Sequence, residues 1–148
     1  MRDPKERKGI SKWELDTPCL VIAEDILEEN IQAMQAYAAA LGKNLRPHAK
    51  THTCSHIAGM QMKAGAVGIC AAKVSEAEAL VNKGSRGVLV TSPVVTDYKI
   101  ERLMKCVSQD PELMVVVDNA ENAGKLNGAA TKHALKLSVL VDLDPGMG

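Results

Sequence analysis

The chain has 148 residues, carries 18 basic and 18 acidic side chains and is 46% apolar, which is enough for one folded domain with a sizeable core. The even charge balance and the lack of a basic stripe argue against nucleic-acid binding, and no apolar run approaches the roughly 20 residues of a membrane helix. Four scattered cysteines without a CxxC pair indicate reduced thiols. We therefore expect a cytoplasmic protein without nucleic-acid or membrane partners.

The first residues are polar and charged, so we predict an N-terminal arm at 1–15 and a folded unit at 16–148. Within that unit, apolar β-branched runs alternate with stretches of helical periodicity. The predicted strands are 19–22, 44–49, 67–71, 87–91, 113–117 and 137–143. The predicted helices are 25–41, 56–64, 75–83, 97–107 and 120–130. Asp25 with Glu28, and Ser75 with Glu78, have the spacing of capping boxes at helix starts.

Strands that alternate with helices about every 24 residues predict an α/β fold of repeated βα units with parallel strands. The strands are almost continuously apolar, which predicts that helices or other elements cover both faces of the sheet. An open doubly wound sheet and a (β/α)₈ TIM barrel both fit this pattern. About six βα units are fewer than a barrel needs, and the chain stops directly after a strand. We therefore expect an incomplete barrel that is the N-terminal part of a longer protein.

Residues 45–56, LRPHAKTHTCSH, hold the densest set of ionisable side chains. If residues 46–52 are extended, Arg46, His48, Lys50 and His52 share one face at the carboxyl end of the second strand. Cationic neighbours and partial burial would lower the pKa of Lys50, and a neutral lysine can form a Schiff base with a carbonyl. From the spacing alone, a solvated polar loop is the favoured interpretation of the same residues.

A zinc site is the third interpretation of this stretch. His48, His52, Cys54 and His56 are ligand types that zinc accepts. Pro47 opposes a helix at this point, and no second ligand pair of known spacing follows. A zinc-binding interaction module stays open as an alternative of a different class.

PHAKTH, preceded by Arg46, resembles the cofactor-lysine motif of the D-threonine aldolase and D-serine dehydratase family. These are fold-type III pyridoxal-phosphate enzymes with an alanine racemase-like N-terminal domain. Three further stretches fit: LDTPCLVI at 15–22 resembles the first strand, AAKVSEAEAL at 71–80 the third strand and its helix, and VDLDPGMG at 141–148 the sixth-strand motif. Asp144, Gly146 and Met147 match its DxGM pattern. One departure is Thr53, where family members often carry lysine; we expect that position to be exposed.

The resemblance implies a TIM barrel of the alanine racemase N-terminal type, with the rest of the barrel and a C-terminal β-domain absent from this chain. It implies pyridoxal 5'-phosphate as cofactor, Lys50 as its Schiff-base lysine and the catalytic residue, and His48 and Asp142 as further cofactor-binding residues. Arg46 and His52 are expected to support the loop. Lys73 is expected to have a structural or charge-balancing role, and the methionines to fill the core.

The activity implied is that of a lyase that cleaves a β-hydroxy D-amino acid to glycine and an aldehyde, as D-threonine aldolase does. A divalent metal (Mn, Mg or Zn) is expected from the missing C-terminal part, and the full-length protein is expected to be a homodimer. The alternatives are a D-serine dehydratase, an amino-acid racemase and a non-catalytic pyridoxal-phosphate-binding protein of the same barrel family.

Overall fold

The computed structural model describes residues 9–146. Its α-helices are α1 (Glu24–Ala40), α2 (Ser55–Lys63), α3 (Val74–Asn82), α4 (Asp97–Gln109) and α5 (Ala120–Lys132). Its strands are β1 (Cys70–Ala71), β2 (Leu89–Val90), β3 (Met114–Val117) and β4 (Ser138–Val141), and two short 3₁₀ turns, η2 (Lys12–Glu14) and η3 (Ala49–Thr51), complete the list. Within the part of the chain described, no helix is both long and apolar enough to cross a membrane. Every predicted helix is confirmed to within two residues at each end.

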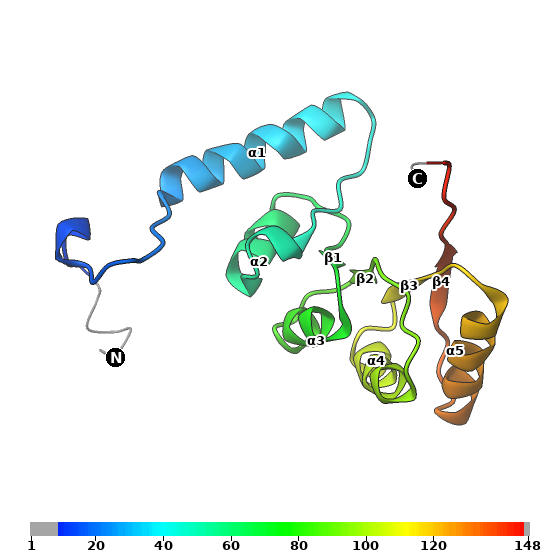
Figure 1. Ribbon diagram of the computed structural model, residues 1–148. Helices are drawn as coiled ribbons and strands as arrows, with labels where there is room; N and C mark the ends of the chain where they lie inside the picture. The colour runs from blue at the N-terminus through cyan, green and yellow to red at the C-terminus, as the bar shows by residue number, and fades with distance from the viewer. Residues whose placement is uncertain (1–8, 147–148) are drawn as a thin grey trace.

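The strands form one parallel sheet in the order β1-β2-β3-β4. β1, β2 and β3 are each followed in sequence by a helix that returns the chain to the next strand, as the βα repeat predicts (Figure 1). A parallel bridge between His48 and Cys70 continues this order by one residue beyond β1. The sheet and its helices are therefore an incomplete barrel of βα units.

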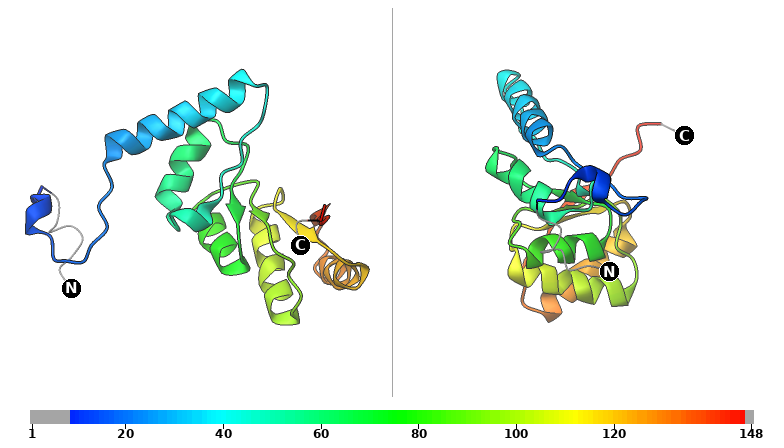
Figure 2. Two further views of the ribbon diagram at one scale, coloured as in Figure 1. Left: turned by 45° about the horizontal axis from the view of Figure 1, so that its top comes forward. Right: turned by 90° about the vertical axis from the view of Figure 1, so that its left-hand side faces the viewer.

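One face of the sheet packs on a layer of helices, in which α3, α4 and α5 lie side by side (Figures 1 and 2). Ala71, Val90 and Val115 point to this layer and are fully buried, whereas Cys70 and Leu89, on the alternate positions, are only partly buried. We call the face that carries Cys70 and Leu89 the inner face. Among the described residues, the predicted cover is complete on the helical face, whereas on the inner face Cys70 and Leu89 are partly buried and Val116 is buried.

Of the first two predicted strands, one does not form and the other is reduced to a single bridge. Residues 19–22 form no strand, and Leu20 is completely exposed. No described strand lies beside this segment, which leads into α1 on the side away from the helical layer (Figure 2). Residues 44–49 run beside β1 and the segment before it. The carbonyl oxygen of Leu45 accepts the N–H of Val67 and that of Pro47 accepts the N–H of Cys70, but only His48 makes a bridge before the chain turns at Ala49.

Both predicted capping boxes are wrong as well. Helix α1 begins after Ala23 and α3 after Lys73, and neither residue caps its helix with a side chain. Ser75 lies inside α3, and Glu78 forms an ion pair with Arg102 of α4 instead. Both pairs of residues have the right spacing, but each helix begins before the position that the pattern marks.

Candidate functional site

The carboxyl ends of the strands meet at one edge of the sheet, where parallel α/β folds place their chemistry. The turn that carries Lys50 follows the bridge at His48, and Lys73, Thr91, Asp118 and Asp142 follow β1 to β4 in turn. Chain segments that are far apart in sequence thus contribute polar side chains to the same edge.

Lys50 lies on η3, not on an extended strand. The prediction that alternate residues of an extended segment 46–52 share one face is therefore wrong. The backbone turns because Ala49 is buried against the core, and its carbonyl oxygen accepts the N–H of Thr53 over 2.7 Å. Lys50 itself is exposed. Thr53 is exposed with a φ of 48°, which confirms the exposure expected of that position.

His48 lies directly before this turn, half-buried on the inner face. Its Nδ1 atom accepts the backbone N–H of Lys50 over 3.3 Å, and its Nε2 atom lies 3.1 Å from Oγ1 of Thr91. Burial holds the pKa of His48 below its ordinary value; the nearby charge of Lys50 acts in the same direction and the carboxylate of Glu76 opposes them. The imidazole therefore ties the end of β2 to the start of the Lys50 turn.

Arg46 does not belong to the edge where Lys50 lies. Its Nη1 atom donates to the carbonyl oxygen of Gly87, before the start of β2, and its guanidinium occupies the space in front of Gly68. Any side chain at Gly68 would overlap that guanidinium. Arg46 thus supports the amino-terminal end of the sheet, which agrees with a supporting role away from a substrate.

The remaining polar residues of the stretch are dispersed. His52 uses Nδ1 to accept the N–H of Cys54 over 3.1 Å, and its buried Nε2 finds no hydrogen-bonding partner among residues 9–146. His56 lines a groove of about 400 Å³ between α1 and α2, together with Glu24 and Glu28. Over the described part of the chain, no three His, Cys, Asp or Glu side chains gather closely enough to hold a metal ion. The geometry therefore gives the zinc interpretation no support.

Asp142 follows β4 and is exposed, and its backbone N–H donates to the carbonyl oxygen of Val117 over 2.8 Å. Because Val117 and Val141 are partners in the register, Asp118 and Asp142 occupy neighbouring positions where β3 and β4 end. Asp118 is missing from the sequence-based candidates. An acidic residue directly after the apolar run MVVV is the signal that marks it.

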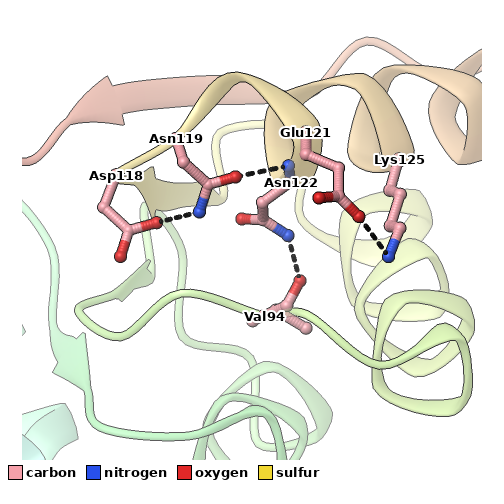
Figure 3. A network of polar contacts seen from close by, with 6 residues as sticks. All are labelled: Val94, Asp118, Asn119, Glu121, Asn122 and Lys125. Atoms are coloured by element: carbon pink, nitrogen blue, oxygen red, sulfur yellow. Dashed lines mark hydrogen bonds and ion pairs between the residues drawn. The ribbon is translucent and has the colours of Figure 1, made fainter.

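The loop after β3 is held by a polar network that sequence reasoning also missed (Figure 3). Asn119 donates from Nδ2 to Asp118 over 2.8 Å and accepts the N–H of Asn122 at Oδ1 over 2.8 Å, so it caps α5. The buried side chain of Asn122 donates to the carbonyl oxygen of Val94, in the loop after β2. These bonds fix the loops after β2 and β3 relative to each other.

The two cysteines of this region, Cys54 and Cys70, are partly buried free thiols. Burial raises the pKa of the Cys70 thiol, against a smaller opposing effect of the Arg46 charge. Of the DxGM residues, Asp144 and Gly146 lie in the chain after β4, where Asp144 accepts the N–H of Gly146 over 2.9 Å. Met147 lies outside the described residues.

Comparison with known proteins gives consistent matches. The chain is 40% identical over 141 residues to the 3-hydroxy-D-aspartate aldolase of Paracoccus denitrificans (strain Pd 1222), covering 95% of this chain and 36% of that protein. The crystal structure of D-threonine aldolase from Filomicrobium marinum superposes with a TM-score of 0.86 at 39% identity, covering 88% of this chain and 35% of the other. D-threo-3-hydroxyaspartate dehydratase from Delftia sp. HT23 superposes with a TM-score of 0.77 at 28% identity, covering 91% and 37%.

The chain thus spans about a third of the length of each of these proteins. The family model described as "Alanine racemase, N-terminal domain" matches residues 22–148, which is most of the chain. The incomplete parallel barrel described above is the fold that this match requires. The chain belongs to the alanine racemase N-terminal domain family.

Proposed function

We propose that this chain is the N-terminal part of a pyridoxal-phosphate-dependent lyase that cleaves a β-hydroxy D-amino acid to glycine and an aldehyde. The observation that carries the proposal is the position of Lys50, an exposed primary amine at the carboxyl edge of the sheet, on a turn held by His48. The likeness to two aldolases, at 40% and 39% identity, supports this choice of reaction.

The residues at this edge fit the cofactor. The exposed amine of Lys50 can reach an aldehyde group. The imidazole of His48 lies beside it on the inner face, away from the helical layer, and its pKa is held below its ordinary value. When bound, pyridoxal phosphate supplies an electron sink for negative charge that develops at the α-carbon of an amino acid. Lys50 would hold its aldehyde carbon, and His48 would lie near its ring.

Asp142 is proposed to help hold the cofactor through the carboxylate that it presents at the end of β4. The buried Nε2 atom of His52, two residues beyond Lys50, has no hydrogen-bonding partner within residues 9–146. A divalent ion that polarises the β-hydroxyl of the substrate would need ligands from outside residues 9–146, since no metal cluster occurs within them. We also propose that residues 1–15 are an N-terminal arm, that residues 16–148 belong to the barrel domain, and that the full-length protein is a homodimer.

Elimination of the β-hydroxyl is the second candidate, and the likeness to a hydroxyaspartate dehydratase favours it. The two reactions differ in the bond to the α-carbon that breaks, which is the bond to the β-carbon in the aldolase and the bond to hydrogen in the dehydratase. Full-length protein incubated with D-threonine and D-serine, with added Mn²⁺, Mg²⁺ or Zn²⁺, distinguishes them by product. Glycine with an aldehyde indicates the aldolase, and a keto acid with ammonia indicates the dehydratase.

Attachment of the cofactor tests the site itself. Full-length protein loaded with pyridoxal phosphate and reduced with borohydride should carry the cofactor on the peptide that contains Lys50. Lys50→Ala should abolish the attachment, whereas Lys73→Ala, an exposed lysine at the same edge, should retain it. Cofactor found on another lysine of the wild-type protein would refute the assignment.

A further inference from the structure

We propose that Thr91 is a positioning residue that holds the imidazole of His48 as the neutral tautomer with its proton on Nε2, and thereby fixes the turn that carries Lys50. The significance of this role for cofactor attachment rests on the function proposed above. Thr91 comes from the end of β2, and no motif in the sequence marks it.

The hydroxyl proton of Thr91 decides the protonation of Nε2. Oγ1 of Thr91 lies 3.2 Å from the carbonyl oxygen of Ala71, which can only accept, so the single hydroxyl proton points to Ala71. The same Oγ1 lies 3.1 Å from Nε2 of His48. Because Thr91 has already used its proton, it must accept in this second contact, and Nε2 must carry the hydrogen.

The backbone of Lys50 decides the protonation of Nδ1. Its N–H points at Nδ1 of His48 over 3.3 Å, and a backbone N–H can only donate. Nδ1 therefore presents a lone pair and no proton. Both ring nitrogens therefore have complementary partners only in the tautomer with its proton on Nε2. Protonation of the ring would place an Nδ1–H group against the backbone N–H of Lys50.

The surroundings of the ring agree with a neutral imidazole. The groups that face His48 are Lys50 on its own turn, Glu76 from α3, and Thr91 and the paired Cys70 from the neighbouring strands. Burial and the charge of Lys50 lower the pKa of His48, and Glu76 opposes them. Burial also raises the pKa of the Cys70 thiol, so this neighbour contributes no charge at neutral pH.

The turn that carries Lys50 depends on the His48 ring for its position. The turn η3 has three residues, and the N–H of its middle residue, Lys50, has the His48 ring as its acceptor. A ring that loses Thr91 can rotate or exchange its tautomer, and it then offers Nδ1 to Lys50 only part of the time. Thr91 thus links the strand end of one βα unit to the reactive amine of another.

The test uses full-length protein with ¹⁵N-labelled histidine and measures the ring nitrogen shifts and the pH titration of His48 without cofactor. The wild-type ring should show the Nε2–H tautomer alone at neutral pH. Thr91→Val should convert this signal to a mixture, and Thr91→Ser, which keeps the hydroxyl, should restore it. Thr96→Val is the matched control, because this exposed threonine makes no side-chain cap at α4 and its loss should leave the signal unchanged.

A second measurement follows borohydride-trapped attachment of pyridoxal phosphate to Lys50 over time. Loss of one positioning hydrogen bond should slow attachment about tenfold in Thr91→Val, with Thr91→Ser close to the wild-type rate. A wild-type ring that is protonated or carries its proton on Nδ1 at neutral pH overturns the inference, even if no variant folds. So does a Thr91→Val protein with the wild-type tautomer and rate. Absence of cofactor from Lys50 in the wild-type protein would refute the proposed function, while the tautomer data would still decide the role of Thr91 toward His48.

Discussion

The carboxylate of Asp110 accepts a hydrogen bond from the backbone N–H of Val88 over 3.1 Å, in a position completely closed to solvent. It also accepts the N–H groups of Gly87 and Glu112, each over 3.3 Å. One side chain after α4 thus satisfies three backbone donors and holds the amino end of β2.

Asp110→Ala leaves these donors without acceptors, two of them at buried positions. The free energy of unfolding should fall by about 3 kcal/mol. Urea unfolding of the full-length protein measures the change, and Asp110→Asn, which keeps one acceptor oxygen, should lose less. An alanine variant as stable as the wild type would show that these donors find other partners.

The ion pair between Glu78 and Arg102 joins α3 to α4. Arg102 donates from Nε to Oε1 of Glu78 over 2.7 Å and from Nη2 to the other oxygen. This hydrogen bonding holds the pKa of Glu78 below its ordinary value of 4.5. A carboxyl whose pKa is lower in the folded state stabilises the protein above its unfolded pKa, and that stability disappears as the pH falls through the folded value.

Glu78→Gln should therefore lower the free energy of unfolding by about 1 kcal/mol at neutral pH. The difference from wild type should shrink as the pH is lowered from 4.5, because the wild-type carboxyl becomes neutral too. Urea unfolding at stepped pH measures this. Lys125→Met, which breaks the exposed pair with Glu121 on α5, is the control and should have a smaller effect. A difference that is constant with pH would contradict the assigned role.

Gly68 lies where the Arg46 guanidinium meets the carbonyl oxygen of Gly87. A methyl group there would overlap both, and because one of them is backbone, the strand must shift. Gly68→Ala should cost about 3 kcal/mol or more in urea unfolding. Gly124→Ala on α5 is the control: nothing lies within 4 Å of its added Cβ, and it should stabilise the protein by about 0.5–1 kcal/mol. Equal effects of the two substitutions would refute the steric argument.

The helices could be predicted from periodicity because their apolar stripes are long and end at glycine or polar residues. Helix α4 shows this, since Ile100, Leu103, Met104 and Val107 are all buried. The capping boxes failed because a pair with the right spacing can also lie inside a helix, as Ser75 and Glu78 do in α3. Glu78 matched the pattern, but a partner from another helix, Arg102, determines its position.

The strands were predictable as apolar runs and their parallel direction from the βα repeat, but which runs would find a neighbouring strand was not. Residues 19–22 have a strand-like composition, yet a strand forms only beside another strand, and none is described there. Residues 44–49 shorten to a bridge at His48 because the chain turns once Ala49 reaches the core. In both cases the tertiary neighbour, rather than local preference, decides the outcome.

The candidate site was predictable only where a motif marks it. PHAKTH singles out Lys50 and His48 as candidates; His48 is extended as predicted, whereas Lys50 lies on a turn. Thr91 is 43 residues from its partner His48, and nothing in the sequence predicts that β2 ends beside that ring. Thr91 reaches His48 because His48 pairs with β1 and β1 pairs with β2, and this register is known only from the structure.

Strand β4 forms an edge of the sheet in this chain, and Val139, Leu140 and Val141 are all exposed on it. An exposed apolar edge strand is a template for pairing with a second chain. The isolated 148-residue chain should therefore bind cofactor poorly and self-associate, and Val141→Lys should slow light-scattering growth several-fold by placing a charge on the edge. Thr131→Lys adds the same charge on the exposed surface of α5 and should change the growth little. Equal rates for both variants would indicate that self-association uses another surface, such as the segment around Leu20, which is completely exposed.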